Sequence, residues 1–256
     1  MSETSTVSMF AARRGRSPFL VVIPARNEAA TVGNVVRDVH QHFHCCVVVV
    51  DDGSTDDTSE AARKAGATVL QLPFQMGAWC ATQAGLRYAK RHGYRIAVTM
   101  DADGQHHASS VPELVKALND DQADVVVGAC PERLSLAKRI AWAYFRALTR
   151  LDIHDFTSGL RAYNRRAIEL LGTRYASLLD YQDIGVLMLV ARQGLRVEET
   201  PVDMSPRQAG HSRVFSSWAV VARYMLRTTI LCLARVGRGN SRVPRPLSGA
   251  VSETST

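Results

Sequence analysis

From Phe19 onward, the sequence alternates short apolar runs with longer segments whose apolar residues recur at helical spacing. The apolar runs are rich in β-branched residues, which is typical of strands buried on both faces. These runs cover residues 19–24, 46–50, 67–72, 95–100 and 123–129, and the segments with helical spacing cover 31–43, 55–65, 77–92 and 109–118. Because helices are the usual crossovers between parallel strands, this order predicts an α/β domain, a Rossmann-like and mostly parallel central sheet flanked by helices.

Residues suited to helix ends support these boundaries. Thr31 is placed to cap the first predicted helix, and Ser54 or Thr55 is placed to cap the second. Gly66 and Gly93 follow the second and third helices, at the position where a glycine commonly ends a helix. The local sequence therefore predicts where these helices begin and end.

Beyond residue 130 the regular alternation stops. A helix is predicted over 134–151, a loop leading into a short strand over 155–163, a helix over 180–193 and a strand over 195–202. We expect this part of the chain to form the second side of a cleft.

The two ends of the chain differ from the predicted domain in composition. Residues 1–18 are rich in Ser, Thr and Arg and predict a flexible leader, and residues 239–256 predict a disordered tail. Residues 207–245 contain eight arginines and no Asp or Glu, in a chain whose net charge is +7. Such a basic end favours an anionic partner: a phosphate, an acidic membrane surface or nucleic acid.

Residues 213–238 are consistent with an amphipathic helix, because their arginines fall within one stripe roughly 120° wide. The stripe comprises Arg213, Arg223, Arg227, Arg235 and Arg238. Two roles stay open for this helix. It lies in an anionic membrane interface, or it docks on the core of its own domain.

The cysteines and the apolar runs bear on where the protein works. The five cysteines form no CxxC pair, and the adjacent Cys45 and Cys46 open a valine run as small apolar residues, which favours the reducing cytosol. No run of about 18 uncharged apolar residues predicts a membrane span. We therefore expect a cytoplasmic protein, with any membrane contact peripheral and at the inner face of the plasma membrane.

The pair Asp101-x-Asp103 follows directly on the apolar run 95–100. Two carboxylates one residue apart at a strand end can face one ion, and hard oxygen ligands suit Mg²⁺ or Mn²⁺. Gln105 continues the two-residue spacing and adds an amide oxygen. The sequence therefore predicts a metal site formed by these three side chains.

Polar side chains also follow two other predicted strands, at 26–28 (Arg-Asn-Glu) and 51–52 (Asp-Asp). Ligands of open α/β sheets bind beyond the carboxyl ends of the strands, so these clusters should meet at one edge. His106 and His107 are expected to support this site or to lie on the surface, rather than to bind the metal.

The predicted helix over 77–92 contains two glycines with different expected roles. Gly77 and Ala78 open the helix, where free backbone N–H groups can receive a diphosphate. Gly85 follows in the spacing Gly77-x-x-x-Ala81-x-x-x-Gly85, and we expect it to permit close packing of the helix on the sheet.

Six stretches occur in an order that is typical of one enzyme family. They are VVIPARNE (21–28), VVVVDDGSTDDT (47–58), MGAWCATQAGLRYA (76–89), TMDADGQHH (99–107), FTSGLRAY (156–163) and VEETPVDMSPRQAGHS (197–212). Together they resemble family 2 of the glycosyltransferases, which has the GT-A type of fold, and the last two are similar to its polyprenyl-phosphate and dolichol-phosphate branch. The resemblance implies one GT-A domain over 19–212, with a nucleotide-binding half at 19–130 and an acceptor half at 131–212.

The resemblance implies a set of nucleotide-binding residues. In such enzymes, residues that match Pro24, Arg26 and Glu28 line the nucleotide pocket, and the residue that matches Asp52 meets the base. Gly77 and Asp101 complete the expected nucleotide-binding set. The implied donor is a nucleoside-diphosphate sugar.

The resemblance also implies a cofactor and an acceptor. Asp101, Asp103 and Gln105 match the D-x-D-x-Q motif that holds a metal in the prenyl-phosphate branch, which implies Mg²⁺ or Mn²⁺. Arg207 and Ser212 match an R-x-x-x-x-S element whose arginine meets phosphate groups. The residues expected to bind an acceptor phosphate are Arg207, Ser212 and Arg213.

Asp183 lies where many family members place an acidic residue near the acceptor. The usual Glu-Asp pair is replaced here by Gln182-Asp183, which weakens the case for Asp183 as a general base. An acceptor phosphate is already ionised at neutral pH and needs no base. The expected catalytic residues are Asp101, Asp103, Asp183 and Arg207.

The expected reaction is a single displacement that inverts the anomeric carbon, with a polyprenyl phosphate or a cell-envelope glycan precursor as acceptor. A sugar-phosphate nucleotidyltransferase is the alternative enzyme, but residues 24–28 lack the glycine-rich loop it would need. A basic nucleic-acid-binding module is the other alternative. It is not expected, because the arginines are confined to one end and few aromatics are interleaved with them.

Overall fold

The computed structural model describes residues 19–120, 123–130, 132, 136–178, 184–205, 225–226 and 228–230. The strands are β1 (Phe19–Ala25), β2 (Cys46–Asp51), β3 (Thr68–Gln71), β4 (Ile96–Thr99), β5 (Val125–Ala129), β6 (Arg161–Asn164) and β7 (Val197–Pro201). The helices are α2 (Val32–His42), α3 (Thr58–Lys64), α4 (Ala78–Arg91), α5 (Val111–Asp120), α6 (Leu136–Thr149), α7 (Arg165–Leu171) and α8 (Ile184–Arg192), with 3₁₀ turns η1 (Ala108–Ser110) and η3 (Arg174–Leu178).

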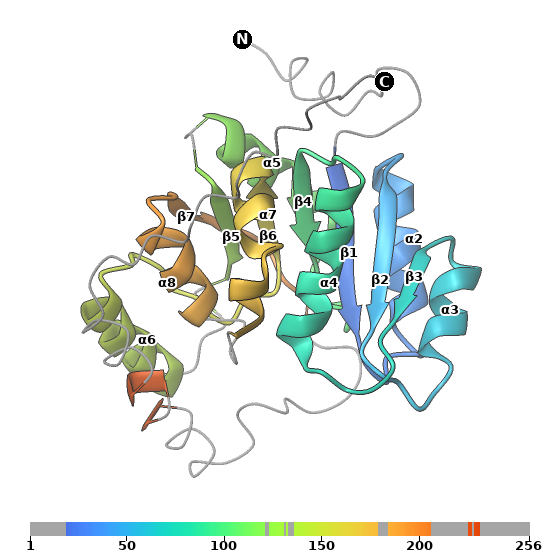
Figure 1. Cartoon of the computed structure of the whole chain (residues 1–256), viewed down its shortest axis with the longest axis horizontal. Coiled ribbons are helices and arrows are strands. Elements are labelled where there is room, and N and C mark those ends of the chain that lie inside the picture. Colours follow the sequence, from blue (N-terminus) through green and yellow to red (C-terminus); the bar gives the residue numbers. More distant parts are fainter. Residues whose placement is uncertain are drawn as a thin grey trace, which may run out of the picture.

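The strands form one seven-stranded sheet in the order β3-β2-β1-β4-β6-β5-β7 (Figure 1). Neighbouring strands are parallel except at β6, which is antiparallel to both β4 and β5. The predicted mostly parallel sheet is therefore confirmed, and the reversed strand is an addition to it. Because Thr99 at the end of β4 pairs with Arg161 at the start of β6, the loop that enters β6 reaches the edge where β4 ends.

Helices cover both faces of the sheet, which explains the continuous apolar strands (Figure 1). Leu20 and Val22 of β1 belong to a core that includes α4, α7 and α8, whereas Val21 and Ile23 belong to a second core with α2 and α5. Alternate residues of one strand thus serve opposite layers. The predicted α/β class with flanking helices is confirmed.

Helix α4 lies unusually close to β1. A Cβ atom built on Gly85 would overlap Val22 Cγ1 and would lie 2.9 Å from its Cγ2. Only a residue without a side chain fits at this contact, so the predicted packing role of Gly85 is confirmed.

One predicted cap is wrong. Helix α3 begins at Thr58 with Asp57 in the capping position, rather than at Ser54 or Thr55. Those two residues instead hydrogen-bond to Asn27, in the loop after β1. The chain therefore remains a loop until 57, because a contact between distant segments overrides a local capping signal.

The other predicted helix ends agree with the structure. Thr31 occupies the N-cap of α2, although its hydroxyl donates to Glu28 rather than capping the helix. Gly66 and Gly93 follow α3 and α4 with φ of 98° and 74°, the left-handed conformation typical of glycine at a helix end.

Cys45 is buried, and burial raises the pKa of its thiol to about 12. It is therefore a packed apolar group, as the sequence predicts, and the described cysteines 45, 46, 80 and 130 are all free thiols. Of the helices that the structure describes, none combines the length and apolar character that crossing a bilayer requires.

Several predicted segments lie outside the described residues. They are the leader at 1–18, the tail at 239–256 and most of the amphipathic segment 213–238. Within that segment, 225–226 and 228–230 are helical. Met225 packs against the core and Thr228 is buried, whereas Leu226 and Ile230 are 64% and 56% exposed. This short helix thus has one docked side and one open apolar side.

Candidate active site

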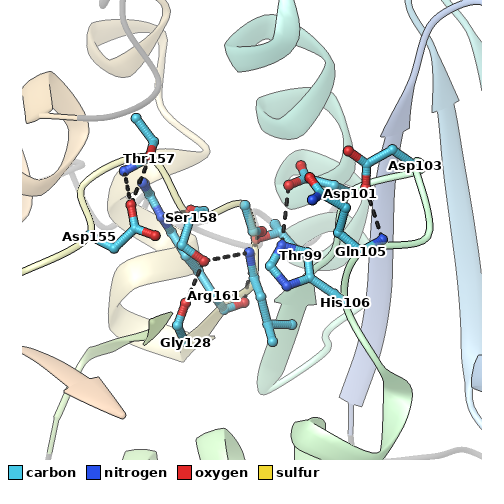
Figure 2. A network of polar contacts seen from close by, with 12 residues as sticks. Thr99, Asp101, Asp103, Gln105, His106, Gly128, Asp155, Thr157, Ser158 and Arg161 are labelled. Atoms are coloured by element: carbon cyan, nitrogen blue, oxygen red, sulfur yellow. Dashed lines mark hydrogen bonds and ion pairs between the residues drawn. The ribbon is translucent and has the colours of Figure 1, made fainter. Parts of the chain in front are cut away.

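The turn after β4 carries the predicted metal-binding residues (Figure 2). The Asp103 side chain is buried, and its Oδ1 accepts a hydrogen bond from the Gln105 N–H at 3.1 Å. Asp101 is partly exposed, and its Oδ2 lies 3.2 Å from His106 Nε2. The structure thus brings Asp101, Asp103 and Gln105 together on one turn at the carboxyl end of β4.

The donors on this turn fit a hard divalent cation. Two carboxylates and the amide oxygen of Gln105 are all oxygen ligands, which Mg²⁺ and Mn²⁺ prefer over nitrogen or sulfur. Within the described part of the chain, no three His, Cys, Asp or Glu side chains form a metal-binding group. A cation here would therefore take its remaining ligands from water and from a phosphate, which is how Mg²⁺ is usually bound.

The loop that enters β6 packs directly against Asp101. A Cβ atom at Gly159 would overlap the Oδ1, Cγ and Oδ2 atoms of Asp101, so the carboxylate occupies space that only a glycine leaves open. Thr99 Oγ1 donates to the Gly159 carbonyl at 2.8 Å, which ties the loop to the end of β4. Sequence reasoning did not connect Gly159 with Asp101, although FTSG at 156–159 belongs to one of the family-like stretches.

The same loop is held by an almost fully buried arginine (Figure 2). Arg161 Nε donates to the Ser158 carbonyl at 2.9 Å, and its Nη2 donates to the Phe156 carbonyl at 2.7 Å. The Ser158 hydroxyl in turn donates to the Gly128 carbonyl at the end of β5. The loop position beside Asp101 is therefore fixed from within the sheet.

The loops after β1 and β2 are joined by hydrogen bonds. The Asn27 N–H donates to Ser54 Oγ at 3.0 Å, and Asn27 Oδ1 accepts from the Thr55 N–H at 2.8 Å. The Glu28 N–H donates to Thr58 Oγ1 at 2.8 Å. Asn27 has a φ of 53°, a left-handed conformation that Asn tolerates better than most residues. These bonds hold Arg26 and Glu28 at the carboxyl edge.

Asp56 completes this junction. Asp56 is exposed, and the slight desolvation of its carboxyl by itself would raise the pKa. Hydrogen bonds from the Thr58 hydroxyl and from the Ala29 and Thr58 N–H groups outweigh that effect and hold the pKa below its ordinary value. The carboxylate is thus an ionised acceptor between the two loops.

Arg26 differs from its neighbours in this junction. It is only partly buried, but its Nε atom is shielded from solvent and has no hydrogen-bond partner among the described residues. Pro24, two residues earlier, lies in β1 and is also partly buried. A shielded Nε–H without a partner in this part of the chain favours an anionic ligand at this edge.

Asp52 and Gly77 contact each other. The buried Asp52 carboxylate accepts hydrogen bonds from the Met76 N–H at 2.6 Å and the Gly77 N–H at 2.9 Å. In this structure the Gly77 N–H is therefore donated to Asp52 rather than free, and the diphosphate-binding role of Gly77 and Ala78 stays a prediction. Each Asp52 oxygen keeps a second lone pair for a further donor.

The predicted acceptor residues Asp183, Arg207, Ser212 and Arg213 lie outside the described residues. The chain leading toward Arg207 is nevertheless placed as far as Ser205. The Ser205 N–H donates to the Gln105 carbonyl at 2.9 Å, and Ser205 Oγ lies 2.8 Å from His107 Nε2. The segment after β7 is thus fastened to the turn that bears the D-x-D-x-Q motif.

The sequence profile of glycosyl transferase family 2 matches residues 20–172 of this chain. The chain is 31% identical over 219 residues to a polyprenol monophosphomannose synthase from Mycolicibacterium smegmatis, covering 77% of this chain and 81% of that protein. It is 30% identical over 217 residues to an undecaprenyl-phosphate mannosyltransferase from Micrococcus luteus, covering 76% of this chain and 86% of that protein.

Solved structures share the same fold. Glucosyl-3-phosphoglycerate synthase from Mycobacterium tuberculosis, crystallised with Mn²⁺, uridine diphosphate and phosphoglyceric acid, superposes with a TM-score of 0.67. The two sequences are 23% identical, and the superposition covers 92% of this chain and 84% of that one. At 23% sequence identity, this structural similarity establishes the fold alone.

Proposed function

The chain belongs to glycosyl transferase family 2 and has the GT-A fold, and from this premise we propose that it transfers a sugar from a nucleoside diphosphate to a polyprenyl phosphate with inversion. The observation that carries the proposal is the turn after β4, which bears both Asp101 and Asp103 at the carboxyl edge, with Asp101 packed against Gly159 (Figure 2). The named relatives that act on polyprenyl phosphates support the acceptor class.

In the proposed reaction, Asp101, Asp103 and Gln105 hold Mg²⁺ or Mn²⁺. The cation would neutralise the charge that develops on the departing diphosphate. Arg26 contributes a second positive charge from the loop after β1, and Asp52, with Pro24 and Glu28 nearby, contacts the nucleoside. The acceptor oxygen attacks the anomeric carbon from the face opposite the diphosphate, which inverts the configuration.

The acceptor side of the proposal depends on residues outside the described ranges. An acceptor phosphate is ionised at neutral pH, so its oxygen attacks without a general base. We propose that Arg207, Ser212 and Arg213 bind this phosphate and that Asp183 orients the acceptor. The bonds that hold Ser205 to the Gln105 turn bring the described end of this segment beside the donor site, which supports the proposal.

Arg26 provides the test of the donor site. Incubation of the full chain with a panel of nucleotide sugars, Mn²⁺ and a short-chain polyprenyl phosphate should release nucleoside diphosphate with one of them. With that donor, an Arg26→Met protein should have a KM about 10–100-fold higher, because a hydrogen bond to a charged group is worth about 1.5–3 kcal/mol. An Arg37→Met protein is the control, because Arg37 is exposed on α2 and bonds only to Asn34 among the described residues.

Two results would count against this function. A chain that releases pyrophosphate from a nucleoside triphosphate and a sugar phosphate, but no diphosphate from any nucleotide sugar, would be a nucleotidyltransferase. An unchanged KM for Arg26→Met would remove the diphosphate role of Arg26.

We further propose that the protein works at the cytoplasmic face of the plasma membrane, by peripheral contact. Helix α6 presents Ile140 and Tyr144, which are 64% and 43% exposed and one turn apart. Tyr144 Oη lies 3.2 Å from Thr229 Oγ1, so the exposed apolar side chains of Leu226 and Ile230, in the helical residues 225–226 and 228–230, extend this surface. Helix α6 contains Lys138, Arg139 and Arg146 but no acidic residue, which suits anionic lipid headgroups.

Sedimentation with vesicles of phosphatidylglycerol and phosphatidylcholine tests this surface. An Ile140→Ser/Tyr144→Ser protein should bind at least tenfold more weakly, because burying each apolar side chain is worth about 1.5–3 kcal/mol. Arg139→Ser should weaken binding about fivefold, at roughly 1 kcal/mol per cation. Arg91→Ser, at the far end of α4, is the matched control and should bind normally. Equal binding by all variants would reject this surface.

A further inference from the structure

His106 belongs to the sequence motif that follows β4, and its side chain contacts Asp101. Its side chain is only 1% exposed, its Nε2 lies 3.2 Å from Asp101 Oδ2, and its buried Nδ1 has no hydrogen-bond partner among the described residues. In a neutral ring only one nitrogen carries a proton. We assign that proton to Nε2, because this choice leaves no buried N–H group without an acceptor. His106 then donates to Asp101.

Gly159 restricts the position of the same Asp101 carboxylate by direct contact. The position of its absent Cβ is filled by Asp101 Oδ1, Cγ and Oδ2, so the carboxylate rests against the glycine backbone. The backbone φ of Gly159 is not in the left-handed region, and therefore the glycine is needed for space rather than for conformation.

Both supports are themselves fixed to the sheet. The Gly159 carbonyl accepts from Thr99 Oγ1 at 2.8 Å, and the Leu160 carbonyl accepts from the Gly128 N–H at 2.8 Å. On the other side, His106 forms an antiparallel bridge with Met204. Asp101 is therefore held between two segments that are each bonded to other parts of the fold, while 40% of its side chain remains exposed.

We infer that His106 and Gly159 are positioning residues, which hold the Asp101 carboxylate in the orientation that binds the divalent cation. The inference rests on the proposed metal role of Asp101. A single hydrogen bond from His106 occupies only one of the roughly four lone-pair sites of a carboxylate, so this bond does not itself prevent the carboxylate from binding a cation. Partners of this kind orient metal ligands, and their loss typically weakens metal binding by about 10–100-fold.

The test is Mn²⁺ affinity of the purified full chain, measured from the electron paramagnetic resonance signal of free Mn²⁺. Titrations are run alone and with UDP or GDP, and the condition in which the wild type binds most tightly is used for all variants. His106→Leu fills the same buried space without a donor, and it should weaken Mn²⁺ binding about 10–100-fold. His106→Gln can place an amide N–H near the position of Nε2, and it should restore most of the affinity.

Gly159→Ala should weaken Mn²⁺ binding to a similar degree, because its methyl group displaces the Asp101 carboxylate. Gly33→Ala is the matched control, since a Cβ there would lie 3.4 Å from the flexible Arg37 Nη1, an ordinary contact. Circular dichroism and melting temperature verify that each variant is folded, and the two histidine variants carry the test if Gly159→Ala does not fold.

The outcomes separate the inference from the function on which it rests. If the wild type binds no Mn²⁺ under any condition, the metal role of Asp101 is rejected and the inference with it. If the wild type binds Mn²⁺ and His106→Leu binds it equally well, the metal role stands and the positioning role is overturned. Weaker binding by His106→Leu with recovery in His106→Gln supports the inference.

Discussion

Replacing Asp103 by Asn is expected to lower the rate of sugar transfer by about 10²–10³-fold, the usual cost of removing one electrostatic stabiliser of a transition state. The protein should remain folded, because the Asn side-chain oxygen can still accept the hydrogen bond that Asp103 Oδ1 accepts from the Gln105 N–H. Asp101→Asn should lose activity to a similar degree. The measurements are kcat for nucleoside diphosphate release in saturating Mn²⁺ and the melting temperature.

Asp57→Asn is the matched control for charge removal. Asp57 is exposed at the start of α3, and its side chain makes no capping hydrogen bond. Its variant should keep wild-type activity. Wild-type rates for Asp103→Asn, or full wild-type activity in excess chelator, would contradict a metal held by this pair.

Replacing Gly85 by Ala is expected to destabilise the protein by about 1–3 kcal/mol, the typical cost of overpacking a core. The new methyl group would overlap Val22 Cγ1 in β1 and force α4 away from the sheet. The intrinsic helix preference favours Ala over Gly by about 1 kcal/mol, so a net loss of stability means that packing outweighs propensity. Urea unfolding measures the change in free energy.

A double-mutant cycle isolates this contact. Val22→Ala removes both methyl groups that the new side chain meets. The double variant should therefore lose less free energy of unfolding than the sum of the losses of the two single variants. Gly33→Ala, in helix α2, should be neutral or slightly stabilising. If Gly85→Ala leaves the free energy of unfolding unchanged, α4 can move away from β1 without cost. The close packing of α4 on β1 would then not depend on this glycine.

The sequence predicts the parallel half of this fold well. A run such as 46–50 can be recognised from its own composition, because burial on both faces leaves only apolar residues in it. The position of Asp101 and Asp103 follows from the same pattern, since a polar pair directly after a buried strand must lie at the carboxyl edge. The family-like stretches then agree with the profile match over 20–172.

Contacts between distant segments could not be predicted in this way. Nothing local to Ser54 indicates that its hydroxyl accepts the Asn27 N–H, and this contact is what moves the start of α3 to Thr58. The four residues of β6 likewise do not indicate that this strand runs antiparallel to its neighbours. Helix α7 was also missed, although Asn164 caps it by accepting the Ala167 N–H at 3.0 Å, a signal that the sequence does contain.

The antiparallel strand β6 affects which loop at the carboxyl edge can change in length without disturbing the sheet. Loops that leave parallel strands also begin the next crossover helix, so changing their length disturbs helix packing. The loop that enters β6 at the same rim is followed by a strand already anchored on both sides by β4 and β5. Because Ile153, Phe156 and Ser158 are buried, the exposed start of this loop at Asp152 is where residues can be inserted while the pairing of Thr99 with Arg161 keeps its register.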